Sequence, residues 1–147
     1  PEARAGPGPH PVILAPRAWL SFRGEDHGMR TRPCARLGEA TLYTTSPEMF
    51  APAEWEGFRA VQERVRLARY GVDCYAYALL ALGHVDLVIE AGLQAFDIAA
   101  PKAVIEAAGG IVTDWRGGDC RHGGQVIAAG DPRAHAEALA ILRKHAG

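Results

Sequence analysis

The sequence predicts an α/β fold. Strand-like and helix-like segments alternate through the second half of the chain, which is typical of a sheet covered by helices. The 147 residues, 48% of them hydrophobic and 22% charged, suffice for one domain with a sizeable core. No apolar run approaches the roughly 18 residues that a membrane span needs, so we expect no membrane segment.

Charge and cysteine content narrow the functional classes. The chain carries 16 basic and 17 acidic residues, a formal net charge of −1, and no basic block. A nucleic-acid partner is therefore not expected, because neutralising phosphates requires clustered Lys and Arg. Cys34, Cys74 and Cys120 are widely spaced and form neither a disulfide framework nor a CxxC metal motif. These features favour a cytoplasmic protein.

The amino-terminal region is expected to differ from the rest of the chain. Residues 1–11 contain four prolines and two glycines, which predicts an irregular lead-in with nothing to bury. Residues 12–14 are compatible with a short strand, and residues 17–29 indicate a strand end and a turn. We therefore divide the chain into a lead-in with a partial strand region at 1–29 and a domain at 30–147.

The next segment predicts two strands and two helices in alternation. Residues 40–45 alternate and are rich in β-branched and aromatic side chains, which indicates a strand. Apolar residues at three- and four-residue spacing predict an amphipathic helix over 53–67. After a short strand at 66–70, the segment 73–82 is apolar on all sides, which predicts a buried helix ended by Gly83.

A buried strand and a further helix are expected in the middle of the chain. Residues 84–89 form the strand, with Glu90 at its end. The helix is expected to start at Asp97, with Pro101 in its first turn, where a missing N–H is tolerated. The glycine pair at 109–110 ends it.

The last third predicts two strands and a closing helix. Residues 111–113 and 125–129 form the strands, on either side of a glycine-rich turn. Asp131 followed by Pro132 is typical of a helix N-cap and first helical position. The helix that follows is expected to extend to about His145.

Glu90 and Asp97 are the first candidates for chemistry. They stand seven residues apart, at an expected strand end and an expected helix start. Carboxylates in these places point into the crevice where open α/β sheets bind ligands. Asp97 there suits a hard metal ion such as Mg²⁺, which prefers carboxylate oxygens. The spacing also fits a second reading, in which Asp97 is simply a helix N-cap.

A longer pattern surrounds these two acids. Residues 92–100 read Gly-Leu-Gln-Ala-Phe-Asp-Ile-Ala-Ala, and residues 105–114 read Ile-Glu-Ala-Ala-Gly-Gly-Ile-Val-Thr-Asp. The pattern resembles the second signature of the inositol monophosphatase superfamily, which runs Trp-Asp-x-Ala-Ala, a helix, and Ala-Gly-Gly-x-Val-Thr-Asp. Phe96 stands where that signature has Trp. The resemblance implies the carboxyl-terminal half of a layered αβαβα sandwich.

Further segments are similar to the histidinol-phosphate phosphatase branch of that superfamily. They are residues 30–34, residues 44–47 and residues 71–77, together with Glu106, which stands one place earlier than the usual Glu of the signature. The similarity extends from about Arg30 to Ala146.

The resemblance implies a Mg²⁺-dependent phosphomonoesterase acting on a small phosphorylated substrate. Asp97 matches the signature's metal ligand and would also touch the substrate, and Glu90 matches its substrate-contacting acid. Gly71, Val72 and Asp73 match the loop that contacts the substrate alcohol. For histidinol phosphate, Asp73 could pair with the ammonium group. From the residues alone, Asp73 fits a helix N-cap equally well, and Glu90 an exposed acid at a strand end.

The superfamily's first signature, Asp-Pro-x-Asp-Gly-Thr with an upstream Glu, does not occur in this chain. Asp97 is therefore the sole matched metal ligand, which is too few for a tight Mg²⁺ site. We expect this chain to be the carboxyl-terminal part of an enzyme and to be inactive alone. We also expect it to expose sheet edges and the face that would meet the missing half, which favours either aggregation or a homodimer.

The activity that these features favour is hydrolysis of L-histidinol phosphate to L-histidinol and phosphate, a step of histidine biosynthesis. An inositol 1-phosphate or nucleotide phosphatase of the same superfamily is the alternative within the enzyme class. From another class, the chain fits a non-catalytic binding module or an inactive fragment.

For several other polar residues the sequence favours or allows a structural role. Tyr75 and Tyr77 suit either the core or a pocket wall, and their sequence context does not separate the two. Cys74 lies in an apolar run, which favours a structural thiol. The remaining prediction concerns four histidines that we expect to be solvated: His10, His27, His135 and His145.

Overall fold

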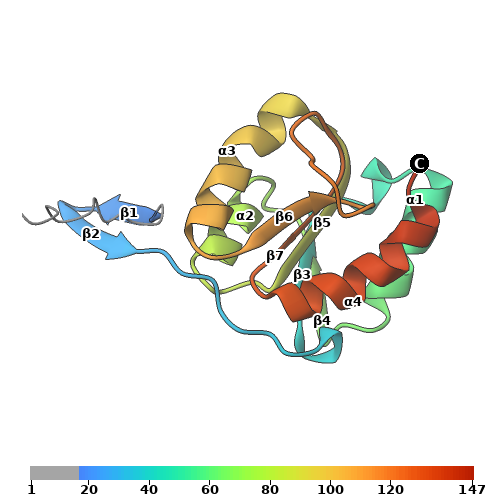
Figure 1. The fold of residues 1–147 in the computed structure, drawn as a ribbon, viewed down its shortest axis with the longest axis horizontal. Helices are drawn as coiled ribbons and strands as arrows, with labels where there is room; N and C mark the ends of the chain where they lie inside the picture. The colour runs from blue at the N-terminus through green and yellow to red at the C-terminus, as the bar shows by residue number, and fades with distance from the viewer. Residues whose placement is uncertain (1–16) are drawn as a thin grey trace, which may run out of the picture.

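The computed structural model describes residues 17–147, so the expectations for 1–14, and for His10, lie outside the described residues. Its centre is a mixed sheet in the order β4-β3-β5-β7-β6 (Figure 1). The strands are β3 (Thr41–Thr44), β4 (Leu67–Tyr70), β5 (Leu87–Gln94), β6 (Ile111–Asp114) and β7 (Gly123–Ala129). β3 is parallel to both β4 and β5, whereas β7 is antiparallel to both β5 and β6. The predicted α/β class is confirmed.

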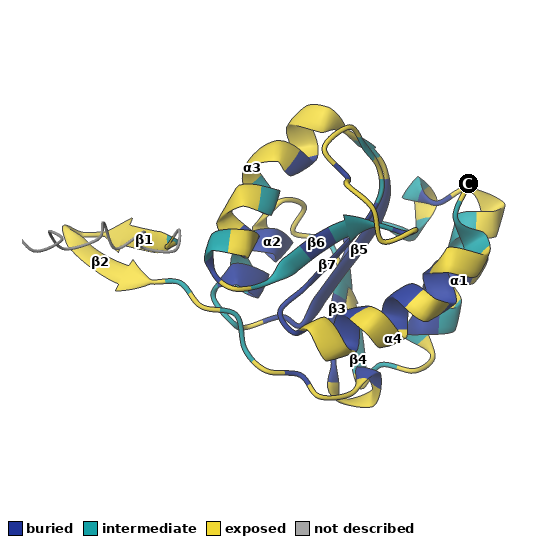
Figure 2. Cartoon of the chain, in the orientation of Figure 1, coloured by how far each residue is buried: buried dark blue, intermediate teal, exposed yellow. Residues whose placement is uncertain are grey.

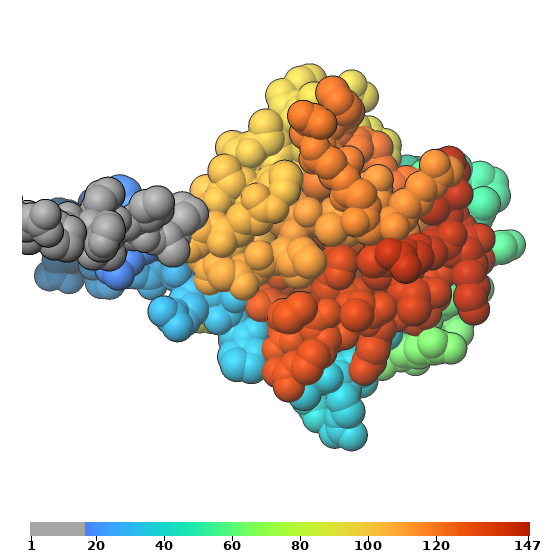
Figure 3. Space-filling view, viewed as in Figure 1, coloured from blue at the N-terminus to red at the C-terminus, as the bar shows by residue number. Residues whose placement is uncertain are grey.

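Two pairs of helices cover the two faces of this sheet. The helices are α1 (Pro52–Gln62), α2 (Tyr75–Ala81), α3 (Ala95–Ala107) and α4 (Pro132–Leu142). α1 and α4 pack on one face, and α2 and α3 on the other. In the space-filling view of Figure 3, α3 and α4 form much of the visible surface. Single turns of 3-10 helix at Leu37–Glu39, Pro47–Met49 and Arg143–His145 complete the domain.

Alternation along β5 divides the core into two layers. Leu87 and Ile89 pack toward α1 and α4, whereas Val88 packs toward α2 and α3. Successive side chains of a strand point to opposite faces, so Glu90 faces the same layer as Val88. In Figure 2 the buried colour is concentrated on β5 and β7 and on the sides of the helices that face the sheet.

A short hairpin extends from this domain (Figures 1 and 2). β1 (Trp19–Phe22) and β2 (Glu25–Gly28) pair antiparallel around a turn at 23–24, where both residues have positive φ. Positive φ at both central positions is typical of a tight hairpin turn. All eight strand residues are exposed. The strand end and turn expected at 17–29 are confirmed, and a second strand, β2, which was not expected, completes the hairpin.

The helix-forming and strand-forming segments are confirmed in order, and the differences lie at their ends. α1 stops at Gln62 rather than Leu67, because the backbone N–H of Leu67 bonds to the Ala40 carbonyl as β4 begins. α2 begins at Tyr75 rather than Asp73, and it is not buried on all sides because Tyr75 is 58% exposed.

β5 and α3 also differ from their predicted limits. β5 continues to Gln94 because, beyond a register shift after Glu90, Leu93 and Gln94 pair with β7. Glu90 therefore lies inside the strand rather than at its end. α3 begins at Ala95, which puts Pro101 in the second turn instead of the first. The ring leaves the carbonyl of the residue four places earlier without a helical N–H partner.

The amino end of α4 agrees with the sequence in detail. Asp131 is the N-cap, and its side chain accepts a hydrogen bond of 2.9 Å from the N–H of Arg133. Its other carboxylate oxygen accepts the N–H of Cys34 at 3.0 Å, so the cap also fixes the segment that leads into β3. Within residues 17–147, no helix is long and apolar enough to cross a membrane.

Candidate active site

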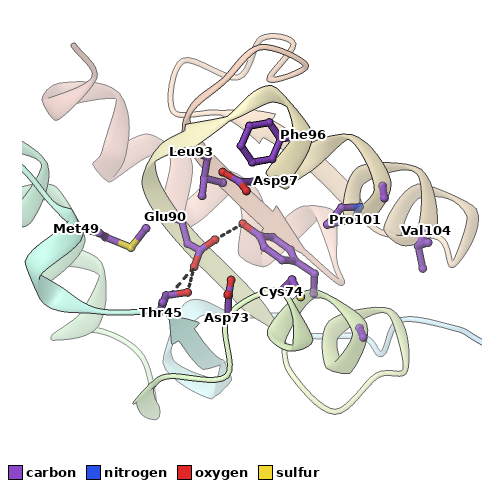
Figure 4. A pocket seen from close by; sticks show the side chains of 13 residues that line it. Thr45, Met49, Asp73, Cys74, Glu90, Leu93, Phe96, Asp97, Pro101 and Val104 are labelled. Atoms are coloured by element: carbon purple, nitrogen blue, oxygen red, sulfur yellow. Dashed lines mark hydrogen bonds between the residues drawn. The ribbon is translucent and has the colours of Figure 1, made fainter.

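A cavity of about 620 Å³ opens between β5, α2 and α3, on the face of the sheet toward which Glu90 points. Three of the five predicted site residues line it together: Asp73, Glu90 and Asp97. Figure 4 shows the three carboxylates around the same space. Gly71 and Val72 are not part of the lining, although they precede Asp73 in the same loop.

Glu90 is the deepest of the three acids, with 2% of its surface exposed. Its Oε1 accepts hydrogen bonds from the N–H of Thr45, at 3.2 Å, and from the hydroxyl of Thr45. Its Oε2 accepts the hydroxyl of Tyr77 at 2.6 Å, as the dashed lines of Figure 4 show. These donors compensate the burial of the carboxylate. The reading of Glu90 as an exposed strand-end acid is therefore wrong.

Tyr77 belongs to both the core and the pocket wall, which answers a question that the sequence left open. Tyr77 is 3% exposed and packs in the core layer between α2, α3 and the sheet. Its hydroxyl reaches Glu90. Burial first, and then the charge of Glu90 and the hydrogen bond to it, raise the pKa of Tyr77 far above its ordinary value. The phenol therefore keeps its proton and donates a hydrogen bond to the carboxylate.

Asp97 lies in the first turn of α3 and is exposed. Its Oδ2 accepts the N–H of Gln94 at 2.8 Å. Gln94 is the N-cap, so the reading of Asp97 as the N-cap itself is wrong, and Asp97 instead satisfies a backbone donor from the third helical position. Its other oxygen, Oδ1, accepts no hydrogen bond from residues 17–147. Capping and ligand binding are therefore compatible roles for this side chain.

The loop at 71–73 has an unusual backbone. Gly71, Val72 and Asp73 have φ values of 95°, 64° and 46°. A left-handed conformation is costly for a β-branched residue such as Val72, and such strain concentrates at functional sites. The N–H of Gly71 bonds to the carbonyls of Thr44 and Thr45, so the loop is tied to the segment that holds Glu90.

Asp73 does not cap α2, which contradicts the structural reading of this residue. Cys74 occupies the N-cap position, and no side chain caps the helix. The carboxylate of Asp73 is exposed and lines the cavity. Its predicted part in substrate binding stays a prediction.

The described residues do not make a complete metal site. Among residues 17–147, no group of three or more His, Cys, Asp or Glu side chains is placed to hold a metal ion. A Mg²⁺ ion normally takes six oxygen ligands, several of them waters. Asp97 could supply one of them, and within residues 17–147 it does not belong to any such group.

The electrostatics of the cavity are one-sided. Its lining holds three carboxylates and, in the part of the chain that the structure describes, no Lys, Arg or His. Met49, Leu93 and Phe96 add an apolar wall. Such a cavity suits a small ligand with a positive group and an apolar ring or chain.

The sequence did not reveal the two side chains that hydrogen-bond to Glu90, those of Thr45 and Tyr77. Thr45 lies in a segment noted only for its similarity, and its contact with Glu90 spans 45 residues. Tyr77 stands four residues after Asp73. In the helix expected over 73–82 that spacing would have put both on one side and indicated a shared pocket, although in the structure Asp73 precedes α2.

Three expectations outside the acids need correction. Cys74 is exposed and lines the cavity, because it precedes the first turn of α2 instead of lying within it. His135 is buried, with Nε2 2.9 Å from the Thr113 hydroxyl, because its side of α4 faces the sheet. His145 is half-buried, and its side chain lies close against Gly57.

Comparison with known families places this site in context. The sequence model described as the inositol monophosphatase family matches residues 29–146. The chain belongs to the inositol monophosphatase family. Members of this family are phosphatases that act on small phosphorylated compounds and generally use divalent metal ions.

Two relatives and one solved structure illustrate the match. The protein named Bifunctional phosphatase IMPL2, chloroplastic, from Arabidopsis thaliana, is 45% identical over 133 residues, covering 84% of this chain and 38% of the relative. A Histidinol-phosphatase from Streptomyces coelicolor is 33% identical over 162 residues, covering 97% and 59% respectively. An inositol monophosphatase from Zymomonas mobilis superposes with a TM-score of 0.77 at 42% identity, covering 84% of this chain and 49% of that one. The chain therefore spans about two fifths to three fifths of the length of these proteins.

Proposed function

We propose that this chain is the carboxyl-terminal part of a Mg²⁺-dependent phosphomonoesterase that hydrolyses L-histidinol phosphate to L-histidinol and phosphate in histidine biosynthesis. The observation that carries the proposal is the cavity with three carboxylates and no basic residue in its described lining. The similarity to a relative named Histidinol-phosphatase supports it.

The charge of the cavity fits the alcohol half of this substrate. L-histidinol carries an ammonium group and an imidazole ring, and a charge-assisted hydrogen bond from an ammonium to a carboxylate is among the stronger polar contacts. Asp73 and Glu90 are the acids that we assign to this half. The phosphoryl group is itself anionic, so it would be repelled by these acids without added positive charge. We therefore propose that a bound Mg²⁺ ion, together with groups outside residues 17–147, would supply that positive charge.

We propose Asp97 as one ligand of the Mg²⁺ ion, at the phosphoryl side of the cavity. In this family of reactions the bound metal would neutralise charge on the phosphoryl oxygens. Asp97 suits this place because it is exposed, lines the cavity and keeps Oδ1 available while Oδ2 bonds to Gln94. Gly71 and Val72 would shape the loop that presents Asp73.

One other substrate is favoured by a specific observation. The solved structure with a TM-score of 0.77 is that of an inositol monophosphatase. The hydroxyl groups of inositol 1-phosphate could donate hydrogen bonds to Glu90, but its ring offers no cation to Asp73. We rank this substrate second for that reason.

Phosphate release in millimolar Mg²⁺, with and without a chelator, tests the proposal. The purified 147-residue chain and the whole protein that carries it are assayed with L-histidinol phosphate. We expect chelator-sensitive turnover by the whole protein and none by the chain alone. Turnover by the chain alone would contradict the proposal that the remaining metal ligands lie outside this chain. Absence of turnover by the whole protein on any phosphomonoester would favour a non-catalytic binding module instead.

A further inference from the structure

Glu90 has an arrangement that the other two acids of the cavity lack. Asp73 and Asp97 are exposed, whereas Glu90 is buried and is bonded by side chains from two other parts of the fold. Thr45 follows β3, and Tyr77 lies within α2. Three elements therefore converge on one carboxylate.

The hydrogen bonds to Glu90 leave little of it free. A carboxylate offers about four acceptor sites, two on each oxygen. Thr45 occupies both sites of Oε1 with its N–H and its hydroxyl, and Tyr77 occupies one site of Oε2. One site on Oε2 then remains for a ligand that enters the cavity. The contact with Tyr77 decides how the carboxylate is rotated, and hence where that last site points.

The position of the Tyr77 hydroxyl is itself set by the core. Its ring packs in the layer that contains Leu80 and Val88. A buried phenol of this kind has few alternative rotamers, so its hydroxyl is held at a fixed point beside the strand. Burial, and then the charge of Glu90, raise the pKa of Tyr77, so the hydroxyl keeps the proton with which it bonds to Glu90.

We propose that Tyr77 is a positioning residue that aims Glu90 at one polar group of the substrate alcohol and so determines which phosphomonoesters the enzyme prefers. Thr45 anchors the opposite oxygen. The inference rests on the proposed function, in which Glu90 binds the alcohol half of the substrate. It applies to an ammonium or a hydroxyl donor alike, because Oε2 can accept from either.

The test compares Tyr77→Phe with Tyr75→Phe in the whole protein that carries this chain. Both changes remove one phenol hydroxyl from α2, but Tyr75 is exposed and no hydrogen bond links it to the site within residues 17–147. Steady-state kinetics are measured with L-histidinol phosphate and with phenyl phosphate, whose leaving group has no donor for Glu90. Thermal unfolding of each variant is recorded alongside.

We expect Tyr77→Phe to lower kcat/KM for L-histidinol phosphate about tenfold, mostly through KM, because hydrogen bonds to charged groups have effects of this size. For phenyl phosphate, kcat/KM should fall by less than about threefold, because the alcohol of this substrate makes no hydrogen bond to Oε2. Tyr75→Phe should leave the ratio between the two substrates unchanged. An equal fractional loss for both substrates in Tyr77→Phe would overturn the inference and indicate a purely structural contact.

A double-mutant cycle provides the second test. If Tyr77 acts through Glu90, then Tyr77→Phe should have almost no further effect on the substrate ratio in the Glu90→Ala background, which lacks the acceptor of the Tyr77 hydroxyl. A full additional loss in that background would show that Tyr77 acts independently of Glu90, which contradicts the proposal.

The unmodified enzyme separates this inference from the proposed function. Turnover of inositol 1-phosphate without turnover of L-histidinol phosphate would refute the proposed substrate. The Tyr77 comparison is then made with inositol 1-phosphate, whose hydroxyls can also donate to Glu90, against phenyl phosphate. A change in that ratio would support the positioning role, and an unchanged ratio would refute it.

Discussion

At the scale of single residues, the proposed binding of Mg²⁺ can be tested at Asp97, the residue that we assign as a metal ligand. Asp97→Asn keeps an oxygen that can accept the N–H of Gln94, so α3 should still begin normally. The change removes a negative ligand, and we expect kcat of the whole protein to fall by about 100-fold or more at fixed Mg²⁺, since bound metal contributes several kcal/mol to such reactions.

The matched control for that change is Asp119→Asn, an exposed acid that pairs with Arg121 in the turn before β7. Its kcat should stay near that of the unmodified enzyme. Steady-state phosphate release over a Mg²⁺ titration measures both variants. Normal turnover by Asp97→Asn would remove Asp97 from the metal site.

We propose that Asp73 makes the enzyme prefer substrates whose alcohol half is positively charged. Asp73→Ala should raise KM for L-histidinol phosphate more than KM for inositol 1-phosphate, because only the first substrate presents an ammonium group. Initial-rate kinetics with both substrates give the comparison. If both KM values rose by the same factor, Asp73 would have no role as a partner of the cation.

The sequence identified acids but not the contacts that hold them. Glu90 and Asp97 were predicted from their spacing and from the family resemblance, and Asp73 from the resemblance alone; the structure places all three around one cavity. Hydrogen bonds that join residues 45 and 13 positions apart, from Thr45 and Tyr77 to Glu90, leave no local periodicity that could reveal them. The alternative prediction that Glu90 is an exposed acid was wrong because these contacts bury it.

At the scale of elements, the amino end of α4 should be sensitive to its cap. Asp131→Ala removes the acceptor for the N–H groups of Arg133 and Cys34. Loss of an N-cap side chain costs about 1 to 2 kcal/mol, so the free energy of unfolding in urea should fall by at least that amount. Asp119→Ala, an exposed acid outside the helices, should change it by less than about 0.5 kcal/mol. Equal losses in the two variants would contradict the role of the cap.

The packing of α4 against the sheet should also depend on pH through His135. Burial, and then the positive charge of Arg143, lower the pKa of His135 from its ordinary 6.5. The unfolded chain therefore binds this proton more readily than the folded chain. Stability should be fully present above about pH 6.5 and should decrease as the pH falls through the lowered pKa.

Urea unfolding between pH 7.5 and pH 5 measures this dependence. His135→Gln should flatten it, because an amide does not titrate in this range, whereas His122→Gln should leave it unchanged because His122 is exposed. An unaltered pH dependence in His135→Gln would show that other groups cause it.

Elements were predictable where a pattern is local, and their ends were not. The N-cap at Asp131 and the segments of all five sheet strands were predicted from residue type and periodicity. The extension of β5 depends on pairing with β7 after a register shift, and the start of α3 depends on where that pairing stops. Both are tertiary contacts, which override local signals at element ends.

At the scale of the whole molecule, the hairpin of β1 and β2 should promote self-association. Trp19 and Phe22 are 64% and 56% exposed, and exposed apolar strands tend to pair between chains. We expect the 147-residue chain to form dimers or larger species, and Trp19→Ser with Phe22→Ser to shift it toward monomer.

Sedimentation velocity at two concentrations measures the shift in both forms of the chain. Exposed Arg59→Ser on α1 is the matched surface control and should leave the distribution unchanged. A monomeric unmodified chain would contradict the expected homodimer.

The overall class followed from alternating patterns, whereas the strand order did not. β5 lies between β3 and β7, so neighbours in the sheet are distant in the sequence, and no local signal specifies which strands pair. The division of the chain at residue 30 stays a proposal.

The measurement that decides between the candidate activities is the ratio of kcat/KM for L-histidinol phosphate to that for inositol 1-phosphate, in the whole protein with saturating Mg²⁺. The acidic cavity predicts a ratio well above one, because Asp73 and Glu90 can bind a cationic alcohol and no basic side chain of the described lining repels it. A ratio at or below one would contradict that assignment and favour an inositol phosphate as the substrate.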